Sequence, residues 1–327
     1  MPPMDAAKPG ESVDGPDERI LTLAILAYRR PDDLRAALPL LVQQLDSVGW
    51  LGEVLVVDND PDASAMEVVQ GLREPRVRYV HESTPGIAAA RNRAIDECPD
   101  SDVLVFIDDD ERPVPTWLSA LLATYEQFRP SGVVGPVTSE FSQEPDPWIL
   151  AGGFFQRRAL STGDPVDVAA TNNLLLDVQA VRDLQLRFDQ RYGLTGGSDT
   201  LFTRQLTARG GRLVWCAEAV VIDIVPADRL TRDWVIRRSF RMGNSMALVE
   251  RDMADSRLAG AAARLRLFGS GLLRVLGGSV RIVLGTVGRS VTQRASGARI
   301  LARGAGLIAG ATGFTYAEYA RRPTAVR

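Results

Sequence analysis

Three consecutive aspartates, Asp108, Asp109 and Asp110, follow the apolar run VLVFI in this chain of 327 residues. Carboxylates this close together repel one another unless a cation neutralises them. Because side chains alternate along an extended segment, we expect Asp108 and Asp110 to point to the same side. Two hard oxygen donors on one side suit Mg²⁺ or Mn²⁺, with phosphate oxygens completing the coordination shell. The alternative is a solvated acidic turn, but the position at the end of a buried strand favours a metal site.

Composition restricts the other kinds of chemistry. The single histidine, His81, excludes poly-histidine metal sites and argues against a serine–histidine triad. The two cysteines, Cys98 and Cys216, lie far apart without the spacing of a zinc site or a disulfide framework, as in a protein of the reducing cytosol. Acid–base chemistry must therefore fall to carboxylates.

Four apolar segments in the first 110 residues predict buried strands, at 20–27, 53–60, 77–82 and 103–110. Segments with helical spacing lie between and after them, including 87–97 and 114–128. This alternation predicts an α/β fold with a mainly parallel sheet, in which ligands gather at the carboxyl ends of the strands. Those ends carry Tyr28, Asp58 and the aspartate triplet, whereas the glycine-rich loop of a dinucleotide-binding unit and a P-loop are both missing.

The second half of the sequence is less regular. Residues 132–137 and 212–224 have strand character, and 170–177 mixes polar with apolar residues ahead of a short helix. The first 18 residues lack the apolar region of a signal peptide and predict a disordered lead-in.

The C-terminal region is strongly basic. From residue 256 onward there are twelve arginines and one acid, a net charge of +11, so the remainder of a chain with charge −3 carries −14. This asymmetry predicts an anionic partner such as a membrane surface. Nucleic acid is not expected, because the region lacks interleaved aromatic residues and the acidic body would repel phosphate backbones.

On an idealised continuous helix, the C-terminal arginines fall on one side and the apolar residues on the other. The arginines interrupt every apolar run, and the longest run, 304–317, is too short to cross a membrane. We therefore expect basic amphipathic segments in the headgroup region. The alternative is a helical hairpin packed on the protein or on a second subunit of a homodimer. The arginines that fall on one side of the idealised helix are Arg274, Arg281, Arg289, Arg299 and Arg303.

An ordered series of motifs resembles the family 2 glycosyltransferases of the GT-A fold. The series comprises AYRRP, VVDND, TPGIAAARNRAI and FIDDDERP, followed by GGSDTLFTRQL and RSFRMGN, and it covers roughly 20–245. The resemblance implies a Rossmann-like, mostly parallel sheet flanked by helices, and inverting transfer from a nucleotide sugar, usually UDP-linked. It divides the chain into a lead (1–18), a GT-A domain (19–245, with a nucleotide-binding half at 19–135 and an acceptor half at 136–245) and a basic helical region (246–327).

The resemblance also implies roles for donor-side residues. Asp58 would contact the nucleobase edge, although it could instead cap the next turn. Asp110 would be the surest metal ligand and Asp108 would approach the metal or the ribose, while Asp109 belongs to the donor side or points away in a structural role. The remaining donor-side residues are Tyr28 near the base, Arg30, and Gly86 and Arg91 on the nucleotide wall; Tyr28 could instead be packing and Arg91 could pair with acids.

Asp199 is the candidate catalytic base. Related families carry an acidic pair at the start of a helix below the acceptor, and here the pair reads Ser198-Asp199. Inversion needs a carboxylate that accepts the proton of the attacking hydroxyl. The alternative is that Asp199 or Ser198 caps the helix and complements its dipole.

Acceptor contacts are expected from Thr171, Asn172, Asn173 and Ser198, although the first three could equally satisfy a local turn. Arg238 and Arg241 have the spacing of an Arg-x-x-Arg-Trp motif, with Met242 in place of the aromatic residue. Either arginine could neutralise a leaving diphosphate; the alternative is a surface ion pair.

Three other classes are possible. A sugar nucleotidyltransferase would need a glycine-rich first loop that AYRRPDD does not supply. A receiver-type phosphotransfer domain would be shorter and would need a lysine, and none follows Lys8. A non-catalytic relative could keep the fold. The expected acceptor is a glycan, a lipid-linked glycan or a small molecule, and the expected location is the cytoplasm or the inner face of the cell membrane.

Overall fold

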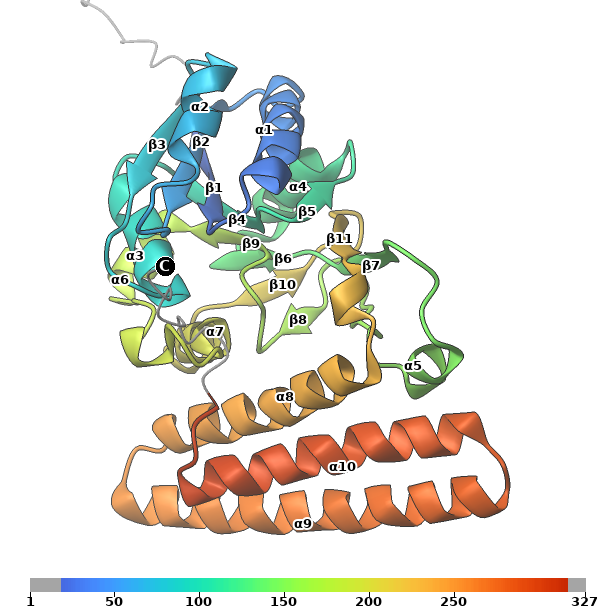
Figure 1. Ribbon diagram of the computed structural model, residues 1–327. Coiled ribbons are helices and arrows are strands. Elements are labelled where there is room, and N and C mark those ends of the chain that lie inside the picture. The colour runs from blue at the N-terminus through green and yellow to red at the C-terminus, as the bar shows by residue number, and fades with distance from the viewer. Residues whose placement is uncertain (1–18, 317–327) are drawn as a thin grey trace, which may run out of the picture.

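The computed structural model describes residues 19–316 and places a layered α/β domain above a layer of three helices (Figure 1). The predicted lead at 1–18 and the end of the chain lie outside the described residues. The strands are β1 (Ile20–Ala27), β2 (Leu51–Asp58), β3 (Val77–His81), β4 (Val103–Asp108), β5 (Glu111–Pro113), β6 (Gly132–Val134), β7 (Val137–Phe141), β8 (Pro165–Val166), β9 (Asn173–Asp177), β10 (Leu213–Trp215) and β11 (Val221–Val225).

The helices alternate with the strands in the first half and cluster at the end. They are α1 (Pro31–Asp46), α2 (Met66–Leu72), α3 (Ile87–Glu97), α4 (Trp117–Phe128), α5 (Pro147–Gly152), α6 (Val178–Asp183), α7 (Ser198–Ala208), α8 (Arg232–Asp252), α9 (Arg257–Val287) and α10 (Val291–Thr312), with short 3-10 turns at Gln190–Tyr192 and Ala227–Arg229.

The main sheet has the strand order β3-β2-β1-β4-β9-β6-β10-β8. Strands β1 to β4 are parallel to one another, and β9 runs antiparallel to β4 and β6. The sheet is therefore mostly parallel, as the sequence predicts, and the carboxyl ends of β1, β2 and β4 lie at one edge.

Both faces of the central strands are buried, because helices cover both sides of the sheet. In β1, Leu21, Leu23 and Ile25 pack with α1 and α4, while Ala24 and Leu26 pack with α3 and α7. This two-sided burial explains the continuous apolar runs in the sequence.

Two segments that the sequence presents as single strands are each divided between two sheets. Residues 132–137 form β6 in the main sheet and the start of β7 in a second sheet of order β5-β11-β7. Residues 212–224 divide in the same way between β10 and β11. The first division occurs at Gly135, where a Cβ would overlap the carbonyl oxygen of Ala219, so the close approach requires glycine.

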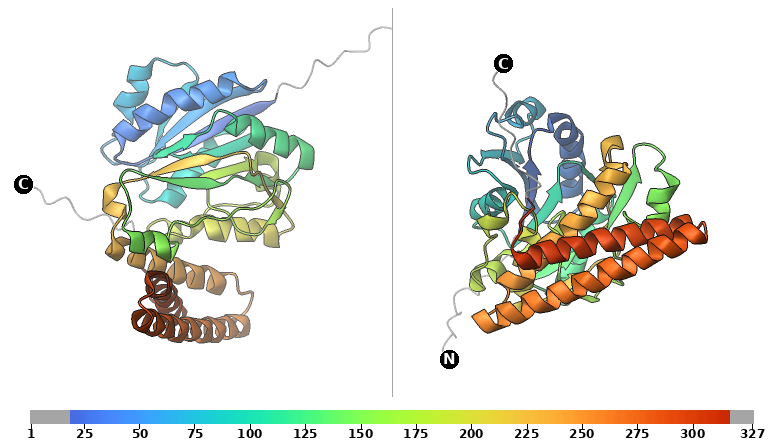
Figure 2. Two further views of the ribbon diagram at one scale, coloured as in Figure 1. Left: turned by 90° about the vertical axis from the view of Figure 1, so that its right-hand side faces the viewer. Right: turned by 60° about the horizontal axis from the view of Figure 1, so that its bottom comes forward.

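The C-terminal region is not one continuous helix, because the chain turns at 288–290. Helices α9 and α10 form an antiparallel hairpin that lies side by side along the base of the molecule, and α10 packs on α8 (Figure 2). The hairpin packed on the protein, which was the alternative, is what the structure shows. The boundary predicted at 245/246 falls inside α8, so the division into regions stays a prediction.

The expectation that no C-terminal segment is long and apolar enough to cross a membrane is wrong, although arginines do interrupt each apolar run. Within the described residues, α9 is long and apolar enough to cross a membrane by length and composition, with a window of 18 residues whose mean hydropathy is 1.5. Only 17% of that window is buried in the protein.

Candidate active site

A cleft of about 520 Å³ lies at the carboxyl ends of β1, β2 and β4 and extends to the second sheet and α8. Its volume is in the range of small-molecule sites. Eleven of the residues singled out from the sequence line it: Tyr28, Arg30, Gly86, Arg91, Asp108, Asp109, Asp110, Asn172, Asp199, Arg238 and Arg241.

The aspartate triplet does not continue the strand. Strand β4 ends at Asp108, and Asp109 and Asp110 form a turn, so the extended conformation expected through Asp110 is wrong, although Asp108 and Asp110 both line the cleft. Instead, the Arg30 Nη1 group donates to Asp109 Oδ1 at 2.9 Å and to Asp110 Oδ2 at 2.7 Å. A second guanidinium, that of Arg229, lies 3.6 Å from the same Asp110 oxygen.

Burial and the neighbouring negative charges raise the pKa values of Asp108 and Asp109. Burial, and then the charge of Asp110, raises the pKa of Asp108 to about 6, and Asp199 is near enough to contribute in the same direction. Burial raises the pKa of Asp109 to about 7 against the opposing effect of Arg30. The cleft therefore presents carboxylates whose charge is poorly compensated by solvent.

Glu111 is a site residue that the sequence analysis missed. Its side chain is buried; Oε2 accepts a hydrogen bond from the Asp108 backbone N–H at 3.2 Å, and Oε1 accepts one from Asn172 Nδ2 at 2.6 Å. Burial, followed by the charge of Asp108, raises the pKa of Glu111 well above its ordinary value. Glu111 thus ties the predicted acceptor residue Asn172 to the triplet, and its position directly after Asp110 was the available signal.

Asp199 lies in the first turn of α7 and accepts a hydrogen bond from the Thr200 N–H at 2.7 Å. The preceding Gly197 has a φ of 95°, a left-handed conformation that favours glycine and turns the chain into the helix at the cleft wall. The neighbouring Ser198 is buried and does not line the cleft. Its Oγ accepts from Arg91 Nη1 at 2.6 Å, so Ser198 holds Arg91 in the wall.

Asp58 lies behind the cleft wall. It is fully buried, and its carboxylate accepts from the backbone N–H groups of Asp60 and Ala65, each at 2.9 Å. The structure therefore gives Asp58 the turn-capping contacts that were its alternative role. Its neighbour Asn59 lines the cleft instead and accepts from the Gly86 N–H at 2.9 Å. A contact between Asp58 and a nucleobase stays a prediction.

Two of the predicted acceptor residues are also buried behind the wall. Asn173 accepts from Trp117 Nε1 at 2.9 Å and donates to the carbonyl oxygens of Pro136 and Ala219 at 2.9 and 2.7 Å, so it connects β9 to the second sheet. Thr171 is buried, and its Oγ1 has no hydrogen-bond partner within residues 19–316. Their acceptor contacts remain untested.

A cluster of arginines forms the other part of the cleft. Arg238 lies 5.3 Å from the Trp234 ring and 5.5 Å from the Phe155 ring. Burial, and then the nearby Arg157 and Arg241, lowers the pKa of Arg238 to about 10. The sequence motif identified Arg238 and Arg241 only, whereas Arg157, Arg229 and Asp223 come from loops and from the second sheet without a recognisable signal.

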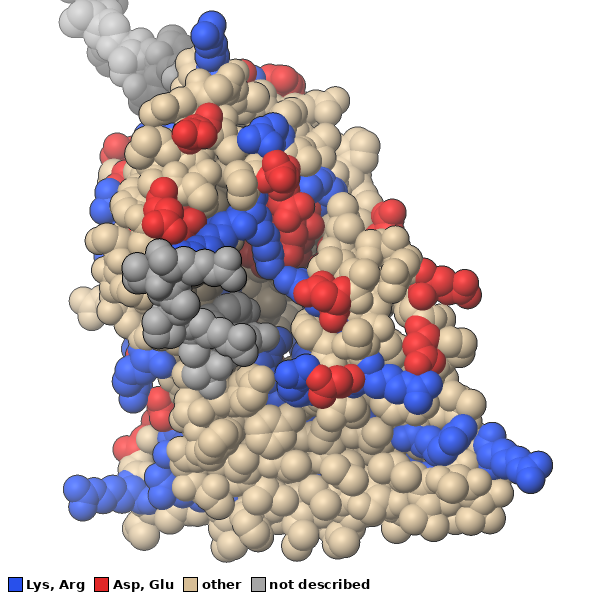
Figure 3. Space-filling model, in the orientation of Figure 1, with Lys and Arg blue, Asp and Glu red and all other residues tan. Residues whose placement is uncertain are grey.

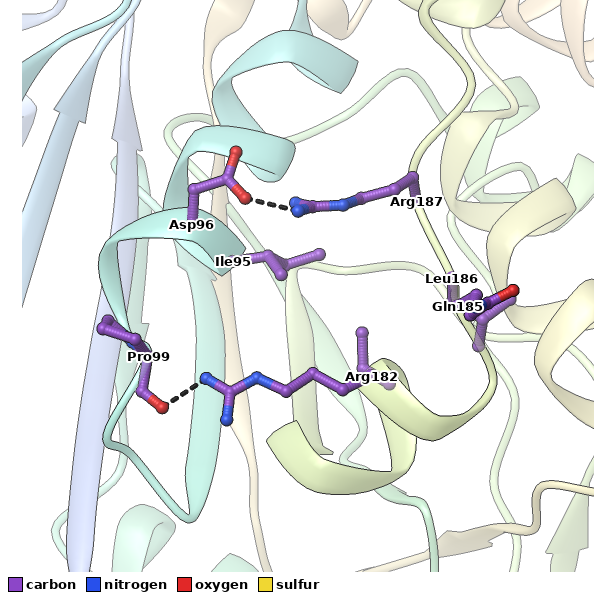
Figure 4. A pocket seen from close by; sticks show the side chains of 8 residues that line it. Ile95, Asp96, Pro99, Arg182, Gln185, Leu186 and Arg187 are labelled. Atoms are coloured by element: carbon purple, nitrogen blue, oxygen red, sulfur yellow. Dashed lines mark hydrogen bonds and ion pairs between the residues drawn. The ribbon is translucent and has the colours of Figure 1, made fainter.

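A second hollow of about 490 Å³ lies between α3 and α6 (Figure 4). Its charged groups interact with one another: Arg187 pairs with Asp96 at 2.5 Å, and Arg182 donates to the Pro99 carbonyl oxygen. Because it contains none of the residues at the strand ends, the cleft beside the triplet is the candidate active site.

Comparison with known proteins identifies the family of the chain. The chain is 31% identical over 234 residues to the succinoglycan biosynthesis protein ExoM of Rhizobium meliloti (strain 1021), which covers 70% of this chain and 75% of the relative. The family model of glycosyl transferase family 2 matches residues 22–184. This chain belongs to glycosyl transferase family 2. The family 2 enzyme is also 28% identical over 105 residues to the uncharacterized glycosyltransferase YibD of Escherichia coli (strain K12), which covers 31% of this chain and 29% of the relative.

Solved structures show the same fold in other glycosyltransferases. The crystal structure of S. aureus TarS 1-349 superposes with a TM-score of 0.51 at 14% identity and covers 75% of this chain and 68% of that one. GalNAc-T7, solved with UDP, GalNAc and Mn²⁺, superposes with a TM-score of 0.56 at 13% identity and covers 73% of this chain and 49% of that one. The chain therefore has the predicted GT-A fold. Its membership of the family identifies it as a glycosyltransferase that uses a nucleotide sugar.

Proposed function

We propose that this family 2 glycosyltransferase is an inverting enzyme that transfers a sugar from a UDP-linked donor to a hydroxyl group of a glycan acceptor. The proposal is carried by the convergence of Asp108, Asp110 and Asp199 with a group of arginines on one cleft. Carboxylates and guanidinium groups together match a donor that has a metal-bound diphosphate beside its reactive sugar carbon. The nucleotide-binding half and the acceptor half predicted from the sequence each contribute to this cleft.

The chemistry of Asp108 and Asp110 fits a divalent cation. The charge of Asp110 contributes to the raised pKa of Asp108, and a cation between the two carboxylates would relieve that repulsion. Within residues 19–316 no group of three or more His, Cys, Asp or Glu residues is placed to hold a metal ion, so phosphate oxygens and water would supply the remaining ligands. Mn²⁺ or Mg²⁺, when bound, would stabilise charge on the leaving diphosphate. GalNAc-T7, which shares the fold, was solved with UDP and Mn²⁺.

Asp199 is the proposed general base. Its carboxylate takes the proton of the acceptor hydroxyl while the hydroxyl oxygen forms a bond to the anomeric carbon of the sugar. On the opposite side of that carbon, the bond to the diphosphate oxygen breaks and its electron pair leaves with the nucleotide. Attack opposite to departure inverts the configuration of the sugar.

The arginines act on the leaving group. Arg238 and Arg241 lie on α8 along the same cleft, and the crowding of Arg238 by neighbouring guanidinium groups is relieved by an anion. Arg30 and Arg229 contact Asp110 and can exchange that contact for a phosphate oxygen. These side chains therefore stabilise negative charge as it develops on the diphosphate.

The acceptor is proposed to be a growing glycan. The relative from Rhizobium meliloti is a protein of succinoglycan biosynthesis, which supports a saccharide acceptor. Asn172 lines the cleft and is held by Glu111, so it can orient a sugar hydroxyl beside Asp199. A lipid-linked form of this acceptor, with the enzyme at the inner face of the membrane, is part of the same proposal.

The test combines donor binding with turnover. We expect UDP and UDP-sugars to raise the melting temperature of the protein in the presence of Mn²⁺. Asp199→Asn should keep this stabilisation but lower kcat by about 10²–10⁴-fold, because the proton acceptor is lost.

Asp233→Asn provides the matched control. Asp233 occupies the first turn of α8, as Asp199 does in α7, but its side chain is exposed and pairs with Arg237. A comparable loss of kcat in both variants would mean that Asp199 acts as a helix-end charge, not as a base. If no nucleotide stabilised the wild-type protein with or without Mn²⁺, the donor proposal would be refuted.

A further inference from the structure

Helix α9 presents an apolar face that no other element of the described structure covers. Ten large apolar side chains of this helix are 42–84% exposed. At about 100° per residue they occupy one arc of the helix, roughly opposite the buried glycines Gly271, Gly278 and Gly285. A soluble monomer rarely exposes so extensive an apolar surface. The ten residues are Leu258, Leu265, Phe268, Leu272, Leu273, Leu276, Val280, Val283, Leu284 and Val287.

The opposite face of α9 is fixed to the protein by close backbone contact. A Cβ at Gly278 would lie 2.7 Å from the carbonyl oxygen of Gly297, and a Cβ at Gly271 would lie 2.8 Å from that of Gly304. Helix α10 is held just as closely to α8, because a Cβ at Gly306 would overlap the carbonyl oxygen of Phe240. Small residues at helix contacts are typical of helices that pack in a lipid environment. The hairpin therefore holds α9 lengthwise along the base of the enzyme.

The charges carried by α9 and α10 themselves have one sign. Residues 256–316 contain nine arginines and no aspartate or glutamate. In Figure 3 the lower part of the molecule, over the C-terminal helices, is a broad uncharged surface with basic groups toward its two ends, while the acidic groups lie above it. Anionic lipid headgroups complement this pattern. A second copy of the same face would bring arginines against arginines, which disfavours a homodimer as the partner.

We propose that α9 lies in the plane of an anionic membrane, with its apolar face at the boundary between headgroups and acyl chains. A helix of 31 residues is about 46 Å long, so this contact would run along the whole base of the enzyme. The length and composition of α9 would also permit it to cross a bilayer, but crossing would require it to leave α10 and expose the glycine face. The proposal is peripheral binding and does not depend on the proposed donor or on inversion.

The experiment measures binding of the full chain to vesicles of phosphatidylcholine with and without phosphatidylglycerol. We expect binding to the mixed vesicles that weakens as salt is raised. Leu273→Glu together with Leu276→Glu should weaken binding by about 100-fold or more, because each leucine contributes roughly a tenfold factor or more to burial in an apolar environment. Both side chains are more than half exposed, so the substitutions remove no core contact.

The matched control is Leu51→Glu together with Met66→Glu, two exposed apolar residues far from the hairpin in the fold. This variant should bind vesicles within about threefold of wild type. UDP-dependent thermal stabilisation of all variants reports separately on the fold and on the donor proposal.

Several results would overturn the proposal. Wild-type protein that ignores the mixed vesicles, or an α9 variant that binds as well as the control, would show that the face does not dock on lipid. A wild-type dimer in sedimentation velocity that the α9 substitutions dissociate would identify a second copy as the partner. Protein that resists alkaline carbonate extraction from membranes would show that α9 crosses the bilayer.

Discussion

Asp109→Asn should change how the stability of the protein depends on pH. The Asp109 carboxyl is 4% exposed and has a pKa of about 7, against an ordinary value of 3.8. Because the pKa is raised in the folded state, the folded protein holds this proton more tightly than the unfolded chain does. The stabilising contribution is present in full below about pH 3.8 and is lost as the pH rises through about 7.

The magnitude follows from the difference of about 3 between the folded and unfolded pKa values. At roughly 1.36 kcal/mol per pKa unit, the whole contribution is about 4 kcal/mol, of which about 2.5 kcal/mol is lost between pH 5 and pH 7.5. Asparagine does not titrate and keeps an oxygen that can accept from Arg30. The free energy of unfolding of Asp109→Asn relative to wild type should therefore increase by about 2.5 kcal/mol over this interval.

Urea unfolding followed by circular dichroism at the two pH values, at constant ionic strength, measures this quantity. Asp62→Asn removes the same formal charge from a side chain that is 78% exposed and serves as the control. A relative stability of Asp109→Asn that is the same at pH 5 and pH 7.5, or that falls, would refute the account of the buried triplet.

Three further predictions concern a buried asparagine, a helix-packing glycine and the proposed metal. Asn173→Ala should lower the free energy of unfolding by about 2–4 kcal/mol, because it leaves the buried Trp117 Nε1 group unpaired and removes hydrogen bonds to two carbonyl groups, of which that of Pro136 keeps the Val221 N–H as a donor. Asn172→Ala should lower kcat/KM with little loss of stability, and equal urea midpoints for the two variants would contradict this. Gly306→Ala should destabilise by about 1–3 kcal/mol through overlap with the backbone of α8, whereas Gly269→Ala, which meets open space, should be neutral or stabilising by up to about 1 kcal/mol in the same assay. Chelation of divalent cations should abolish stabilisation by UDP in a thermal shift and added Mn²⁺ should restore it, since the carboxylates of the triplet otherwise repel the diphosphate; a UDP effect that survives chelation would argue against the metal site.

The parallel half of the fold could be predicted because its signals are local. The helix predicted at 87–97 agrees with α3, and the apolar runs that lead to Tyr28 and Asp108 are strands whose ends meet at the cleft. The direction in which each side chain at a strand end points was harder to predict. Asp58 and Asn59 differ by one residue, yet the first faces inward to cap its own loop and the second faces the cleft, because neighbouring side chains point in different directions.

The arginine side of the cleft could not be predicted because it depends on contacts distant in the sequence. Arg157 and Asp223 reach the cleft from a loop and from the second sheet, which Asn173 connects to the main sheet through hydrogen bonds more than 35 residues apart. The α9–α10 hairpin was one of two alternatives that the sequence left open. The arginine pattern favoured an interpretation based on charge. The packing of α9 on α10 instead depends on Gly271, Gly278 and Gly285, which are spaced seven residues apart.

The three C-terminal helices set the distance between the catalytic cleft and the surface that α9 contacts. Helix α8 lines the cleft, α10 packs on α8, and α9 packs on α10. Packed helices lie about 8–10 Å apart, and α8 also contacts α9 directly through the Glu250–Arg266 ion pair at 3.1 Å, so the α8 wall stands about 8–10 Å or more above the axis of α9. A hydroxyl next to a lipid anchor would remain below Asp199, and only a sugar carried some distance out along its glycan would reach it. The layer would then act as a spacer that selects acceptors by length as well as by chemistry.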